Sequence, residues 1–169
     1  MRGRVHRVLS ALGHEEVRYL VVGGVAVVLH GYLRTTVDLD LVIQLEPQNV
    51  RRAIRVFKEL GFEPRVPVSI ESFADEGERA RWVREKNARV FSVWHPDEPG
   101  FLVGLFVEEP FDFDERYRRA AIARLDDQEV RVLAIDDLVE MKRAAGRPQD
   151  LADVEALRAL GRSDSEERP

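Results

Sequence analysis

A buried strand that ends abruptly in two glycines constrains the fold of this chain more than any other feature. Residues 19–22 (Tyr-Leu-Val-Val) are apolar throughout, which predicts a strand inside a sheet. Gly23 and Gly24 follow directly, and glycine lets a backbone turn sharply and approach a ligand closely. The next apolar residues, 25–30, predict a short helix whose free N–H groups can help to cradle a phosphate. The segment therefore predicts a tight strand-to-helix turn with room for a phosphate.

Residues 36–45 alternate in polarity and predict a second strand, which carries Asp38 and Asp40 on one face. Side chains at i and i+2 of a strand share a face, with Cα atoms about 6.6 Å apart. Two carboxylates in this arrangement repel each other unless water solvates them or a cation lies between them. Hard divalent ions such as Mg²⁺ prefer oxygen ligands, commonly one or two carboxylates with substrate phosphates. Two interpretations stay open, a site for Mg²⁺ or Mn²⁺ and a solvated edge strand with two outward aspartates.

The remaining pattern predicts an α+β fold, in which a mixed sheet is flanked by helices and the C-terminal part is helical. Amphipathic stretches predict helices at residues 3–12, 47–60, 74–86, 113–122, 136–145 and 148–160. Further strands are predicted at 89–94, 101–107 and 129–133, and the first two of these form a hairpin. The chain length fits one domain over residues 1–160, with 161–169 as a polar, disordered tail.

Composition excludes several classes of site. The 169 residues contain no cysteine, which excludes disulfides, thiolate metal sites and cysteine nucleophiles. The net charge of −5 means that any contact with a polynucleotide needs a local basic patch. The longest apolar run, residues 19–29, is too short to span a bilayer, and the N-terminus lacks the pattern of a signal peptide. We therefore expect no membrane contact and a cytoplasmic location.

A second group of charged residues lies where the last two predicted helices meet. Lys142 offers a point charge to phosphate oxygens and Arg147 offers a fork of donors, while Asp150 can orient either cation. The same residues can instead form a salt-bridge cluster between the helices, with Pro148 beginning the last helix. The residues alone favour the structural cluster over a ligand site.

The block from residue 23 to residue 40 contains a glycine pair, a short helix, a third glycine, an Arg/Thr pair and Asp-X-Asp. In this order of features it resembles the signature of the nucleotidyltransferase superfamily. It is most similar to the bacterial branch of minimal, abortive-infection toxin-like proteins, and residues 137–157 resemble that family's second block. The resemblance implies that a nucleoside triphosphate and Mg²⁺ or Mn²⁺ bind. It implies nucleotide contacts at Gly23, Gly24, Arg34, Thr36 and Arg147, metal ligands at Asp38 and Asp40, and catalytic roles for Asp38, Asp40 and Lys142.

The resemblance also implies an acceptor for the nucleotide, either RNA or protein, and a third carboxylate on a later strand. The expected position of that carboxylate is Gly104, which offers no side-chain oxygen. Glu108, Glu109 and Asp112 follow the strand and are candidate substitutes. Three hypotheses remain open. The chain is an active transferase with a substitute acid, a nucleotide-binding module without efficient transfer, or a partner-binding protein such as one half of a toxin–antitoxin pair.

Overall fold

The computed structural model describes residues 2–126 and 128–166, with side chains described for 3–126 and 128–161. The helices are α1 (Arg2–His14), α2 (Gly23–Leu29), α3 (Pro47–Glu59), the 3₁₀ helix η1 (Ile70–Ala74), α4 (Glu76–Lys86), α5 (Phe113–Arg118), α6 (Ile135–Ala145) and α7 (Pro148–Glu166). The strands are β1 (Tyr19–Val22), β2 (Leu39–Ile43), β3 (Glu63–Pro64), β4 (Val90–Trp94), β5 (Leu102–Phe106), β6 (Ala121–Leu125) and β7 (Gln128–Val132).

All the described strands form one mixed sheet in the order β3-β4-β5-β2-β1-β7-β6. The pairs β1–β7 and β2–β5 are parallel, and the other neighbours are antiparallel, including the predicted β4–β5 hairpin. This arrangement confirms the predicted α+β class. The register places Asp40 opposite Val22 on one side and Gly104 on the other, so Asp40 lies at the centre of the sheet.

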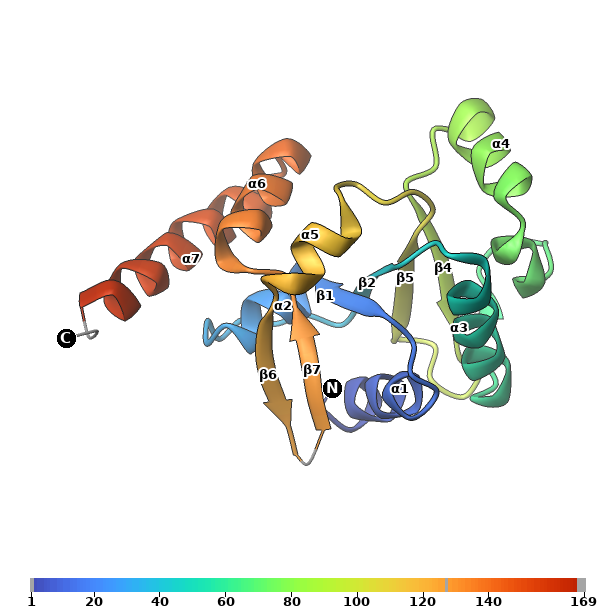
Figure 1. Ribbon diagram of the computed structural model, residues 1–169, viewed down its shortest axis with the longest axis horizontal. Coiled ribbons are helices and arrows are strands. Elements are labelled where there is room, and N and C mark those ends of the chain that lie inside the picture. Colours follow the sequence, from blue (N-terminus) through green and yellow to red (C-terminus); the bar gives the residue numbers. More distant parts are fainter. Residues whose placement is uncertain (1, 127, 167–169) are drawn as a thin grey trace.

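The two faces of the sheet are covered unequally. One face lies beneath α1, α3 and η1, where Tyr19 donates a hydrogen bond to the Leu9 carbonyl and the Phe73 ring lies against Phe91. On the other face α2 covers β1 and β2 and contacts α6. The part of this face on β4 and β5 is only half-buried, at Val90 and Phe106 among others. Figure 1 shows α6 and α7 at one end of the molecule and α3 and α4 at the other.

Several predicted boundaries are wrong. The strand predicted at 36–45 begins only at Leu39, so Asp38 lies just before it. The helix predicted at 113–122 ends at Arg118, because the following residues pair with β7 as the unpredicted strand β6. Helix α7 continues to Glu166, into the segment predicted to be a disordered tail, and residues 167–169 lie outside the described residues. Within the described residues, no helix has the length and apolar character needed to cross a bilayer.

Candidate functional site

The turn between β1 and α2 leaves space that the Asp40 carboxylate fills. Gly23 has a φ of +66°, a conformation that residues with a Cβ adopt at a cost. A Cβ at Gly23 would lie 2.1 Å from Asp40 Oδ2, which is far inside van der Waals contact. The N-cap residue of α2, Val22, makes no side-chain capping hydrogen bond. The turn therefore places a carboxylate beside helix amides that no side chain of the cap residue satisfies.

The segment between α2 and β2 is extended and brings further polar side chains to this turn. Arg34, Thr36 and Asp38 are half-buried, whereas the residues that alternate with them are exposed, with Leu33 at 87% and Val37 at 57%. Such alternation places the side chains of residues 34, 36 and 38 on one side of the segment. A Cβ at Gly24 would lie 2.5 Å from both Arg34 Nη2 and Thr36 Oγ1, so these two side chains cross directly over that glycine.

The electrostatics of Asp40 show which charges surround it. Burial raises the pKa of Asp40 above its ordinary value of 3.8, and the negative charge of Asp38 raises it further. The cations Arg147, Lys142 and Arg34 lower it, but they do not compensate fully. Two carboxylates and three cations thus lie within electrostatic range of one another. An additional positive charge at the carboxylates would relieve the repulsion that remains.

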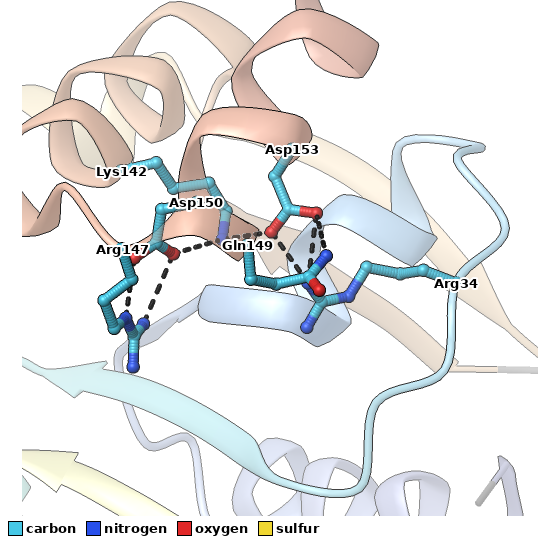
Figure 2. Close-up of polar contacts among 6 residues, drawn as sticks. All are labelled: Arg34, Lys142, Arg147, Gln149, Asp150 and Asp153. Atoms are coloured by element: carbon cyan, nitrogen blue, oxygen red, sulfur yellow. Dashed lines mark hydrogen bonds and ion pairs between the residues drawn. The ribbon is translucent and has the colours of Figure 1, made fainter.

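Figure 2 shows how the cations are held. Lys142 Nζ lies 2.6 Å from Asp153 Oδ2 and 3.3 Å from Asp150 Oδ1. Arg34 Nη1 donates to both oxygens of Asp153, at 3.0 and 2.8 Å, and Arg147 Nε donates to Asp150 Oδ2 at 2.6 Å. Asp153 is fully buried. It therefore joins the Arg34 segment to α6 and α7, and we name these five residues the charged cluster.

The structure contains the inter-helix salt bridges that sequence patterning favoured, and it places them within range of Asp40. Burial raises the pKa of Asp150, but hydrogen bonds from Arg147 and Lys142 outweigh that effect and hold it below its ordinary value. Lys142 is only 5% exposed, whereas the Arg147 side chain is 76% exposed. Of these two cations of the charged cluster, Arg147 is thus the one that a ligand can reach directly.

Sequence analysis missed Asp153, the most buried member of the charged cluster. The available signal was its spacing, because Asp150 and Asp153 stand at i and i+3 on α7 and so share one face of that helix. Its partner Arg34 is far away in sequence, and no pattern along the chain connects the two.

The position of the expected third carboxylate lies directly beside Asp40. Gly104 pairs with Asp40 in the sheet, and a Cβ at Gly104 would lie 2.7 Å from Asp40 Oδ1 and 2.8 Å from Val90 Cγ1. Residue 104 thus faces the same side of the sheet as Asp40. Within the described residues, no three Asp, Glu or His side chains gather closely enough to hold a metal ion by themselves.

The three proposed substitutes for the missing acid all follow β5. Glu109 Oε1 accepts a hydrogen bond from the Leu45 amide at 2.7 Å, and Asp112 caps α5 by accepting from the Glu115 amide. Leu45 follows the end of β2, and five residues of extended chain separate it from Asp40 by about 16 Å. Glu108 precedes Glu109 at the same end of the sheet. Because β2 and β5 are parallel and carry Glu109 away from Asp40, Glu109 is not placed to replace the missing acid, whereas a role for Glu108 or Asp112 stays a prediction.

A substitution at the turn tests this geometry. Gly23→Ala is expected to lower the melting temperature by several degrees, because the left-handed conformation alone costs roughly 1–2 kcal/mol and the new methyl group displaces Asp40. Gly3→Ala is the control, since nothing lies within 4 Å of a Cβ at Gly3. Differential scanning calorimetry of both variants makes the comparison, and equal melting temperatures would contradict the close packing of Asp40 on the turn.

Comparison with known proteins identifies the fold. No protein-family model and no curated protein sequence matches the chain. The lincosamide antibiotic adenylyltransferase LnuA, solved with lincomycin, matches with a TM-score of 0.65 at 13% identity, over 95% of this chain and 98% of that one. The structure of ANT(2")-Ia in complex with adenylyl-2"-tobramycin matches at 0.60 and 13%, over 98% and 92%. An antigenic nucleotidyltransferase-like protein from Paracoccidioides brasiliensis matches at 0.56 and 17%, over 94% and 75%.

At these identities the similarity establishes the fold alone. The chain has a nucleotidyltransferase-like fold, as the resemblance of residues 23–40 implied. The narrower resemblance to the abortive-infection toxin-like branch stays a prediction.

Proposed function

We propose that the protein binds a nucleoside triphosphate together with Mg²⁺ or Mn²⁺ at the β1–α2 turn, and that it transfers the nucleotide slowly or not at all. Asp38 and Asp40 would hold the metal ion. Gly23 and Gly24 would approach the phosphates through their backbone, flanked by Arg34 and Thr36. The bound ion would neutralise charge on the carboxylates and the triphosphate together.

One observation carries this proposal most directly. Asp40 is a partly buried carboxylate whose pKa is raised by burial and by Asp38, although three cations lie within range. Such an arrangement costs the folded protein stability, and ionisable groups with perturbed pKa values cluster at functional sites. The donor set also fits the ion, because two carboxylates provide hard oxygen ligands and phosphates can provide the others.

The cations have separate roles in this proposal. Arg147 is exposed and can donate to phosphate oxygens, although it also pairs with Asp150. Lys142 was expected to contact the nucleotide, but it is buried between Asp150 and Asp153. We therefore propose that Lys142 contributes positive charge from behind the site and fixes the position of α7.

Slow nucleotide transfer is expected because residue 104 is a glycine. A general base in the transition state is typically worth roughly 10²–10⁴ in rate, and Gly104 provides neither a base nor a third metal ligand. Because Gly104 is the neighbour of Asp40 and faces the same side, a carboxylate there would reach the proposed metal site. The Val90 and Asp40 side chains would have to shift to admit it.

Gly104→Asp is accordingly expected to raise nucleotide transfer by about 10²-fold or more. Incorporation of radiolabelled nucleotide into total RNA and protein measures transfer by wild type, Gly104→Asp and Gly104→Asn. The asparagine variant is the matched control, because it has the same size without the charge. Equal incorporation by the two variants would contradict the role given to the missing acid. Robust transfer by wild type that is lost in Asp40→Asn would show that the protein is an efficient transferase after all.

Two finer points stay proposals. The acceptor is RNA or protein if the toxin-like resemblance holds, and a cognate antitoxin or other partner protein would then be expected, as would a cytoplasmic location. The alternative function is a regulatory module that binds nucleotide or a partner without transfer. Nucleotide-dependent stabilisation separates a nucleotide-binding module from a purely partner-binding one, since a ligand raises the melting temperature only of a protein that binds it.

A further inference from the structure

One face of α6 lines a cavity, and it is not the face that carries the buried Lys142. Asp137, Glu140, Met141, Ala144 and Ala145 stand at the i, i+3, i+4, i+7 and i+8 spacing that defines one helix face. The opposite face of α6 is buried, with Leu138 and Lys142 turned toward the core. The two alanines at the end of the helix leave room in front of it.

The half-buried face of β4 and β5 lies across from this surface. Val90 and Phe106 form the sheet side of a cavity of about 560 Å³, and Pro110 and Phe111 from the β5–α5 connection complete its apolar wall. Cavities of roughly 300–1,000 Å³ are the usual size for small-molecule sites. The volume therefore fits a small molecule, whereas an extended RNA or a protein surface would need a longer groove.

The cavity adjoins the proposed nucleotide site. Val90 Cγ1 lies 2.8 Å from the position of a Cβ on Gly104, and Gly104 is the sheet neighbour of Asp40. Arg147 lines the cavity and also lies within electrostatic range of Asp40. A molecule in the cavity would thus lie next to the carboxylates.

The charges that line the cavity favour an anion. Asp137 is already neutralised by ion pairs with Arg116 and Arg119, at 3.1 Å from Arg116 Nε and in direct contact with Arg119. Arg89 is exposed at the wall of the cavity, and within the described residues it has no ion pair or side-chain hydrogen bond. Arg116 also lies 3.7 Å from Glu140, and Arg147 pairs with Asp150, so Arg89 is the arginine of the lining whose charge no described carboxylate balances.

We infer that this cavity binds a small molecule with an apolar body and an acidic group, the acidic group lying at Arg89. Only the position of this small molecule beside a bound nucleotide rests on the proposed function. The apolar body contacts Phe106, Phe111 and Met141, and the anion gains a charge interaction that no protein carboxylate already satisfies.

The probe for this inference is 1-anilinonaphthalene-8-sulfonate, an aromatic anion that becomes fluorescent in apolar surroundings. Saturable binding to the folded wild type is expected. Ala144→Trp fills the cavity and should weaken binding at least about tenfold, and Arg89→Ala should weaken it about fivefold through the lost charge. Ala152→Trp on the exposed surface of α7 and Arg143→Ala on α6 are the matched controls, and both should bind the probe as wild type does.

Calorimetric melting of every variant shows that a loss of probe binding does not come from unfolding. Equal probe affinity for Ala144→Trp and Ala152→Trp would overturn the inference, as would the absence of saturable binding to wild type. Displacement of the probe by Mg²⁺·ATP in direct competition would also overturn it, because the cavity would then be the nucleobase site. If the wild type binds the probe as predicted but does not bind Mg²⁺·ATP, the result would support the inference about the cavity and contradict the proposed nucleotide binding.

Discussion

Replacing Asp153 with alanine is expected to lower the free energy of unfolding by about 3 kcal/mol. Asp153 is fully buried and pairs with both Lys142 and Arg34, so its loss removes the carboxylate partner of Arg34 and the shorter of the two ion pairs of Lys142 in a region of little solvent. We expect the lower end of the usual 3–5 kcal/mol range because Asp150 still faces Lys142. For a domain of this size the change corresponds to a fall in melting temperature of about 10 °C.

Differential scanning calorimetry measures the effect, with Gln149→Ala as the control. Gln149 is exposed and only donates a long hydrogen bond, at 3.4 Å, to Asp153 Oδ1, so its loss should change stability by no more than about 0.5 kcal/mol. Asp153→Asn keeps the shape of the side chain and should still cost most of the effect, because the charge is what holds the cations. Equal melting temperatures for Asp153→Ala and Gln149→Ala would show that the charged cluster does not stabilise the fold.

The second large effect has the opposite sign. In metal-free buffer near neutral pH, Asp40→Asn is expected to raise the melting temperature by several degrees. Burial and Asp38 raise the pKa of Asp40 in the folded protein, so the folded state disfavours the ionised carboxylate more than the unfolded chain does. That penalty is fully present above the folded pKa, and it disappears as the pH falls toward the ordinary value of 3.8.

The difference in melting temperature between Asp40→Asn and wild type should therefore shrink as the pH is lowered from about 7 to about 4. Taking the difference removes the effects of all other acids, which both proteins share. Thermal melts across this pH range make the measurement, with Asp97→Asn as the control because Asp97 is 91% exposed in the β4–β5 turn. A wild type more stable than Asp40→Asn near neutral pH would mean that the neighbouring cations dominate over burial and Asp38.

Local sequence predicted the elements whose signals lie within a few residues of one another. The β1 strand was predicted from four apolar residues and a glycine stop, and α3 from the amphipathic pattern of residues 47–60. The β4–β5 hairpin followed from two apolar runs joined by a segment rich in proline and charge. In each case the pattern and the tertiary contacts agree.

The errors arise where distant pairing decides the structure. Residues 121–125 were expected partly as helix, but they pair with β7, and pairing across a sheet overrides local propensity. Asp38 was placed in a strand, but β2 begins at Leu39, although the extended segment before it continues the alternation. The partnership of Arg34 with Asp153 spans the whole fold, so no local pattern could have indicated it.

The central claim is that Asp40 and its surroundings bind a metal–nucleotide complex. Isothermal titration calorimetry with a non-hydrolysable ATP analogue, in Mg²⁺ and then in Mn²⁺, tests it most directly on wild type, Asp40→Asn and Asp97→Asn. We predict metal-dependent binding to wild type and to Asp97→Asn, and an affinity at least about tenfold lower for Asp40→Asn. Binding that is equal in wild type and Asp40→Asn would contradict the account, and so would the absence of binding to wild type with either metal.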